Sequence, residues 1–110
     1  MFKVEVGKVL KDFHGTPIIN QSTTPMAAMT VKDVFLTHLG LWTPRDGQKH
    51  IRAYALGIKL VYEPNETIFL EDAEMELLKE SMAEPKTAVM VYAPAKEALD
   101  SATKGTGTLQ

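Results

Sequence analysis

The chain contains three histidines, the side chains that most often bind a transition metal or exchange a proton near neutral pH. They are His14, His38 and His50, and no two of them have the spacing of an H-x-x-x-H zinc motif on a helix. The sequence also has no cysteine to complete such a site. His38 lies near the expected end of a helix, where the helix dipole favours a positive charge. We therefore expect no metal site and no cofactor.

Sequence motifs for other kinds of catalysis are missing as well. There is no G-x-G-x-x-G or G-K-[ST] phosphate loop, and Ser22, Ser81 and Ser101 lie in no nucleophile elbow. Many of the carboxylates fall in one run, which is better explained as a solvated helix face with a negative N-terminal end than as an acid–base pair. The run comprises Glu71, Asp72, Glu74, Glu76, Glu80 and Glu84. We expect a protein that is not an enzyme.

A cluster of basic residues on and just before one expected helix is the clearest candidate for a binding surface. Such a helix can follow a phosphate backbone, but the formal net charge of -2 argues against a dominant nucleic-acid patch. A tryptophan shortly before the cluster is of the type that anchors protein interfaces, although tryptophan is more often part of a core. The candidate interaction surface consists of Trp42, Arg45, Lys49, Arg52 and Lys59.

The length of 110 residues suits one domain with a single core. The hydrophobic fraction of 45% and the charged fraction of 24% are those of an ordinary globular protein. No run approaches the roughly 18 apolar residues of a membrane span, and the first residues lack the apolar centre of a signal peptide. We expect a single domain over residues 1–102, a disordered tail over residues 103–110, and a soluble intracellular protein with no membrane contact.

Alternating apolar and charged residues predict a β-strand over residues 2–10. Residues 11–17 have the composition of a turn, with Asp12 to bond the backbone and Gly15 to allow a positive φ. A second strand begins at Ile18 and Ile19, so the N-terminal region is expected to form a β-hairpin. Residues 20–25 are polar and aperiodic, which predicts a linker or an exposed loop.

Capping signals predict where the first two helices begin and end. Thr30 and Asp33 form a capping box ahead of the first helix, and Gly40 ends it. The second helix begins at Pro44, or as late as Asp46, and continues to about residue 62. Its buried face is expected to consist of Ile51, Tyr54, Ala55, Ile58 and Val61, at steps of three and four.

The third and fourth helices follow a short apolar segment at residues 67–70, which is expected to pair with the hairpin or to pin the next helix. Glu71 and Asp72 place negative charge at the start of the third helix, and Pro85 closes it. Residues 87–99 form either one helix kinked at Pro94 or a strand followed by a helix that begins at Pro94. The apolar stripe continues across the proline, which favours the kinked helix.

The second half of the chain carries several short patterns in a fixed order. The first half contributes one further pattern, L-x-D-x-x-G-x-P-I, at the turn of residues 10–18. The others are G-I-K-L at residues 57–60, L-L-K-E at 77–80 and A-x-E-A-L-D at 95–100. Together they resemble small, mostly uncharacterised proteins encoded by tailed bacteriophages and prophages. The resemblance implies action inside an infected cell or in virion assembly, and it supplies no catalytic residues.

The sequence therefore predicts an α-rich α+β fold, with an N-terminal β-hairpin followed by about four helices, the last one kinked. The generous apolar content also predicts a homo-oligomer, most simply a two-fold dimer. Its expected interface consists of Met75, Leu78, Met82, Val91, Tyr92 and Leu99.

Three functions are compatible with the sequence. The first is a phage accessory protein that binds a host or phage protein in the host cytoplasm, for host takeover or to counter host defence. The second is a virion assembly factor, such as a tail chaperone or a head–tail component. The third, which the net charge disfavours, is a nucleic-acid-binding regulator that uses residues 45–59.

Overall fold

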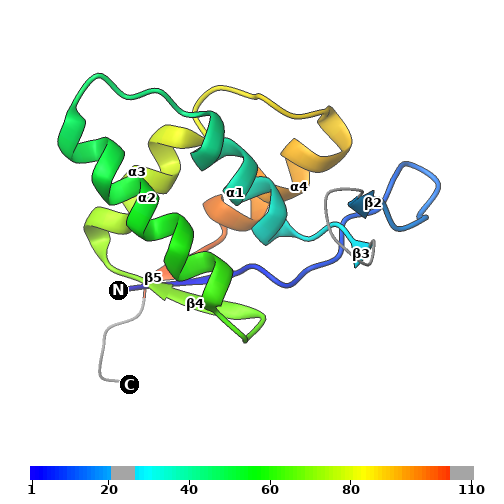
Figure 1. Ribbon diagram of the computed structural model, residues 1–110. Helices are drawn as coiled ribbons and strands as arrows, with labels where there is room; N and C mark the ends of the chain where they lie inside the picture. The colour runs from blue at the N-terminus through cyan, green and yellow to red at the C-terminus, as the bar shows by residue number, and fades with distance from the viewer. Residues whose placement is uncertain (21–26, 105–110) are drawn as a thin grey trace.

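The computed structural model describes residues 1–20 and 27–104, and it confirms a helix-rich α+β fold with an N-terminal antiparallel hairpin and four helices (Figure 1). The helices are α1 (Val31–Leu41), α2 (Gly47–Tyr62), α3 (Asp72–Ser81) and α4 (Val89–Asp100). The strands are β1 (Phe2–Glu5), β2 (Ile19–Asn20), β3 (Ala27–Ala28), β4 (Thr67–Leu70) and β5 (Thr103–Lys104).

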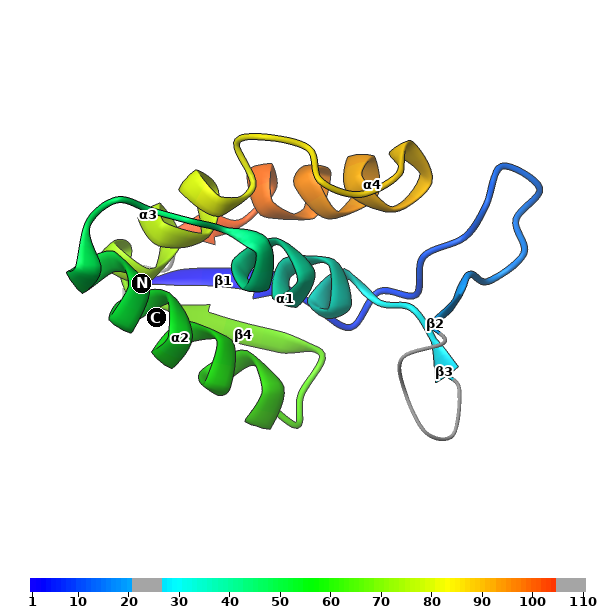
Figure 2. The ribbon, with the colours of Figure 1, turned by 45° about the horizontal axis from the view of Figure 1, so that its top comes forward.

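A three-stranded antiparallel sheet joins the two ends of the described chain, in the order β4-β1-β5. Val4 and its register partner Ile68 are fully buried, whereas Lys3 and Phe69 on the opposite face are exposed. The sheet therefore has one face in the core and one in solvent, as period-two alternation predicts. Figure 2 shows α1 between α2 and α4, and α1 contacts both of these helices.

The N-terminal strand is shorter than expected, and its partners are distant in sequence. β1 ends at Glu5 because the next two amides, those of Val6 and Gly7, both donate to the carbonyl of Glu66, at 2.8 and 3.0 Å. A side chain at position 7 would also collide with Glu66, whose Cβ lies 2.6 Å from the place of a Gly7 Cβ. β1 pairs with β4 and β5, and the hairpin is formed by β2 and β3.

The predicted turn at residues 11–17 is present and projects from the body of the protein (Figure 2). The Asp12 carboxylate accepts the amides of His14 and Thr16 at 2.9 and 3.0 Å. Gly15 has a φ of 84°, the left-handed conformation that glycine adopts without strain. The linker predicted at residues 20–25 lies, after Asn20, outside the described residues.

Local capping determines where the first three helices begin. The backbone amide of Thr30 donates to the Asp33 carboxylate at 2.8 Å, which confirms the capping box of α1. Asp46 accepts the Gln48 amide at 2.8 Å and caps α2, so this helix begins at the later of its two predicted positions. At α3, Glu71 and Glu74 form an equivalent box. α1 passes through Gly40 and ends one residue later.

Two predictions for the C-terminal segment are now decided. α4 is one helix that contains Pro94, so the alternative of a strand followed by a helix is wrong. Thr103 and Lys104, which were expected to belong to a disordered tail over residues 103–110, instead pair with β1 as strand β5. Residues 105–110 lie outside the described part of the chain.

The residues expected to form an oligomer interface belong instead to the core of the single chain. The set Met75, Leu78, Met82, Val91 and Leu99 is 0–8% exposed. Tyr92 is half-buried, and its hydroxyl donates to the carbonyl of Met82. The five side chains other than Tyr92 are covered within the chain and have almost no area left for a second copy. Any association between copies must therefore use other residues.

Candidate protein-binding surface

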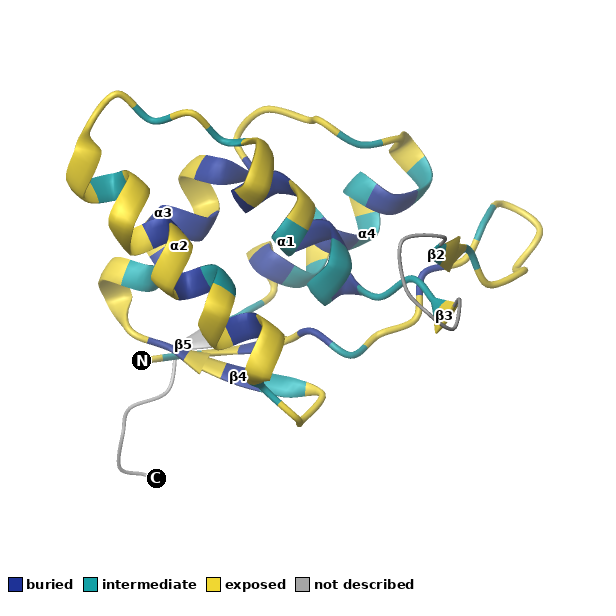
Figure 3. Cartoon of the chain, in the orientation of Figure 1, coloured by how far each residue is buried: buried dark blue, intermediate teal, exposed yellow. Residues whose placement is uncertain are grey.

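α2 exposes the face that its apolar periodicity predicted to be buried (Figure 3). The side chains that enter the core are those of Ala53, Leu56 and Leu60, which are 0–7% exposed. The exposed apolar stripe, which we call the α2 seam, consists of Ile51, Tyr54, Ile58 and Val61, with exposures of 65, 74, 41 and 53%. The prediction that the α2 seam is buried was therefore wrong. α2 is apolar on two sides, and only one side faces the core.

A groove lies beside the α2 seam, between α2 and α1. It encloses about 370 Å³, and its lining contains no carboxylate. Trp42, from the predicted interaction surface, is half-buried and lines the groove, so it serves partly as a structural residue between the helices. The lining residues are Leu36, Leu39, Gly40, Trp42, Pro44, His50, Ala53, Tyr54, Gly57, Ile58 and Val61. The groove and the α2 seam therefore form one continuous apolar surface.

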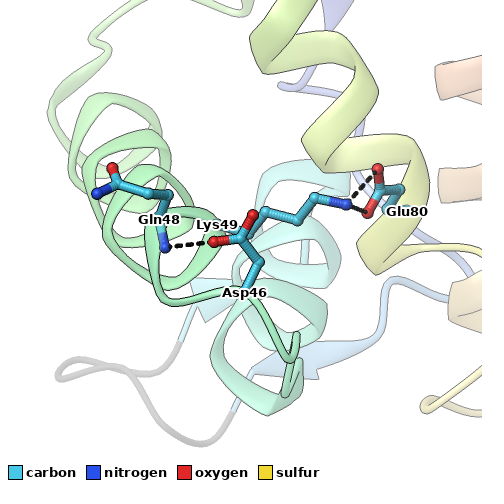
Figure 4. A network of polar contacts seen from close by, with 4 residues as sticks. All are labelled: Asp46, Gln48, Lys49 and Glu80. Carbon is cyan, nitrogen blue, oxygen red and sulfur yellow. Dashed lines mark hydrogen bonds and ion pairs between the residues drawn. The ribbon is translucent and has the colours of Figure 1, made fainter.

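The basic residues of the predicted interaction surface do not lie on this apolar surface. Lys49 reaches across to Glu80 of α3, with Nζ 2.9 Å from the carboxylate (Figure 4). Lys59 makes the same kind of contact with Glu74, also at 2.9 Å. Arg52 is seven residues from Lys59 and therefore lies on the same side of α2. Two of the four basic groups thus hold α2 against α3 and are already matched by carboxylates.

The remaining basic residues, Arg45 and Arg52, are exposed, and no salt bridge of either one is found within residues 1–20 and 27–104. Arg45 lies just before α2, at the end of the groove marked by Pro44. The five predicted residues therefore separate into a groove residue, a neighbouring arginine, and three residues on the side of α2 that faces α3. They do not form one continuous basic patch, which weakens the nucleic-acid interpretation.

The contact with Glu80 has a pH dependence that can be tested. The hydrogen bond and the charge of Glu80 raise the pKa of Lys49 above its ordinary value of 10.5. A raised lysine pKa stabilises the fold at pH values below 10.5, and this contribution is lost as the pH rises through the raised pKa. Glu80→Gln should therefore lower the free energy of unfolding at neutral pH and have less effect at strongly alkaline pH. Both side chains are about 40% exposed or more, so the effect is small.

Urea unfolding of the wild type and Glu80→Gln at the two pH values measures this difference. Glu84→Gln is the control, because Glu84 is exposed and is not among the charges that raise the Lys49 pKa. An equal effect of Glu80→Gln at both pH values would show that the ion pair with Lys49 is not responsible.

The three histidines are separate, and each has a different environment. His38 is fully buried: its Nδ1 lies 3.0 Å from the carbonyl oxygen of Val34, and its Nε2 accepts the Lys86 amide at 3.1 Å. His14 and His50 are exposed, the first in the turn and the second on α2. Within the described residues, no group of three or more potential metal ligands is close enough to hold an ion. Helix-dipole stabilisation, expected for His38 from sequence, does not account for its burial.

The sequence does contain a pattern that indicates the exposed α2 seam, although the prediction assigned these residues to the core. The α2 seam has spacings of three, four and three residues, which is the pattern of the a and d positions of a coiled coil. Leu56 and Leu60 form a second, narrower stripe on the same helix. Two apolar stripes on opposite sides of one helix indicate that the core can cover only one of them.

In the described residues, no helix is both long enough and apolar enough to cross a membrane. Comparisons of the chain with protein-family models, with curated proteins and with solved structures gave no match.

Proposed function

We propose that this chain is a non-enzymatic binding protein that acts by holding another protein against the α2 seam and the adjoining groove. The observation that carries this proposal is the exposure of large apolar side chains in one place. Tyr54 and the neighbouring Tyr62 are 74 and 77% exposed, which for aromatic side chains amounts to roughly 300 Å². Surfaces of this kind on a single chain are typical of protein interaction sites.

The chemistry of the surface indicates the kind of partner. A groove between two helices, with an apolar seam along one edge, accepts the apolar face of a further helix. Because the groove lining has no carboxylate and Arg45 lies at one end, an acidic residue at the corresponding end of the partner would be favoured. The proposed partner is therefore an amphipathic helix of another protein that carries an acidic residue near one end.

The resemblance to small phage proteins makes a bacterial host protein the first candidate partner, met in the host cytoplasm during takeover or in countering a defence. A phage structural protein is the second candidate and would make the chain a virion assembly factor. The proposal does not extend to nucleic acid, because Lys49 and Lys59 each have a carboxylate oxygen 2.9 Å away.

Site-specific photo-crosslinking tests the proposal. A photoreactive phenylalanine analogue at position 54 in bacteria should give covalent adducts with a protein other than the chain itself. The same analogue at position 89 is the control, because Val89 is 69% exposed but lies on α4. Ile58→Asp in the same chain should remove the adducts at position 54 while the circular dichroism spectrum stays unchanged.

The captured protein is then purified and titrated against the wild type and Ile58→Asp. We expect binding at least tenfold weaker for the variant, because a charge is placed in an apolar contact. Failure to obtain adducts at position 54, or equal adducts at positions 54 and 89, would contradict the proposal. The identity of the captured protein separates host takeover from virion assembly.

A further inference from the structure

We propose that, in the absence of another protein, the α2 seam is covered by the α2 seam of a second copy, with the two helices antiparallel across a two-fold axis. This inference rests on the proposed role of the α2 seam as a protein contact, and it concerns how that contact is regulated. The same side chains cannot be covered twice. Self-association and partner binding therefore exclude one another.

The spacing of the α2 seam is self-complementary. Ile51 and Val61 are equidistant from its midpoint at Leu56, and so are Tyr54 and Ile58. A two-fold axis at this midpoint places Ile51 opposite Val61 of the second copy and Tyr54 opposite Ile58. Apolar residues at alternating a and d positions interlock in this way when two helices pack along their length.

The residues that flank the α2 seam permit this pairing. Gln48, Ala55 and Tyr62 lie along one side, and His50 and Gly57 lie along the other. None of them is a lysine, an arginine or a carboxylate, so two copies bring no strongly charged side chains into opposition. Tyr62 also adds apolar surface. A pairing between copies would otherwise be discouraged by like charges at these positions.

The charges at the two ends of α2 select the antiparallel arrangement. Arg45 precedes the N-terminus of α2, and Glu63 and Glu66 follow its C-terminus; Arg45 and Glu66 are exposed. Antiparallel copies bring Arg45 toward the glutamates of the second copy, at both ends of the contact. Parallel copies would bring arginine to arginine and glutamate to glutamate. Antiparallel helix dipoles favour the same choice.

The area available fits a reversible dimer. The exposed apolar side chains on this face of α2 are Ile51, Tyr54, Ile58, Val61 and Tyr62, each between 41 and 77% exposed. The two tyrosines alone supply roughly 300 Å² of the roughly 800 Å² that each partner contributes to a standard interface. The aliphatic side chains supply a further share. The contact is thus large enough to form and small enough to be exchanged for another protein.

Single cysteines give a direct test, because the natural chain has none. Ala55→Cys lies next to the proposed axis and should cross-link to itself through a short bismaleimide. Gln48→Cys should not, because its two copies would be separated by roughly 24 Å along the helix axis, the rise of sixteen residues. Mixed with Tyr62→Cys, however, Gln48→Cys should cross-link, since antiparallel pairing places position 48 beside position 62.

Sedimentation of the uncross-linked protein over a hundredfold range of concentration should show a monomer–dimer equilibrium. Ile58→Asp should raise the dissociation constant at least tenfold, whereas Val89→Asp on α4 should leave it unchanged. A wild type that stays monomeric throughout, or self-cross-linking of Gln48→Cys, would overturn the inference. A monomer that still gives foreign adducts at position 54 would sink this inference and leave the proposed function standing. A dimer that gives no adducts with another protein would leave the antiparallel pairing standing and would contradict the proposed function.

Discussion

Replacing Leu56 by alanine should lower the free energy of unfolding by about 3 kcal/mol, whereas replacing Ile58 should lower it by less than about 1 kcal/mol. Leu56 is 1% exposed and belongs to the hydrophobic core, so its loss removes buried contacts and leaves a cavity. Ile58 is 41% exposed on the same helix, and its truncation leaves no enclosed cavity. Because both substitutions shorten an aliphatic side chain to alanine within two residues on α2, differences in helix propensity are small.

Urea unfolding of the two variants in dilute solution, followed by circular dichroism, measures both values. Dilution matters because a dimer through the α2 seam would add stability that depends on concentration. If Ile58→Ala proved the more destabilising of the two, the face of α2 predicted from the sequence would be the buried one. In that case the α2 seam would not exist as an exposed surface, and the proposals based on it would fall.

The helices could be located from the sequence because their ends are specified locally. The Thr30–Asp33 box, the Asp46 cap and the glutamates at the start of α3 each bond a backbone amide within three residues. Such contacts depend on neighbouring residues alone. By contrast, neighbouring residues alone do not determine which face of α2 is buried. That choice depends on which stripe meets α1 and α3, and both stripes are apolar.

The sheet was harder to predict because its pairing is almost entirely non-local. Alternation identified β1 as a strand, but Phe2 pairs with Leu70 on one side and with Lys104 on the other. Nothing near β1 in the sequence specifies these partners. The short apolar segment at residues 67–70 was compatible with a strand that pairs with the hairpin and with a segment that only pins the next helix. The residues of β5 were assigned to the expected tail.

The expected dimer interface illustrates how core and interface are confused in a sequence. The stripes of α3 and α4 are apolar enough for either role, and counting them as interface assumed too little cover within the chain. Met82 and Leu78 are both fully buried because α1 and the sheet supply that cover. The apolar excess that predicted association is real, but it lies on α2.

Replacing His38 by alanine should lower the free energy of unfolding by about 3 kcal/mol. The imidazole is fully buried beside Tyr92, with ring centroids 5.4 Å apart. Since Nε2 accepts the Lys86 amide, the ring proton lies on Nδ1 and is donated to the carbonyl of Val34. His38 therefore ties α1 to the segment that leads into α4. Alanine removes the ring volume and leaves the Lys86 amide without this acceptor.

A second substitution separates the two contributions. His38→Leu restores most of the apolar volume but not the acceptor, so it should cost about 1–2 kcal/mol, mainly from the unpaired Lys86 amide. His50→Ala is the control: His50 is exposed, and its loss should change stability by no more than about 0.5 kcal/mol. Urea unfolding of all three variants at one fixed pH measures these differences. Equal costs for alanine at positions 38 and 50 would show that the buried ring does not join α1 to the α4 segment.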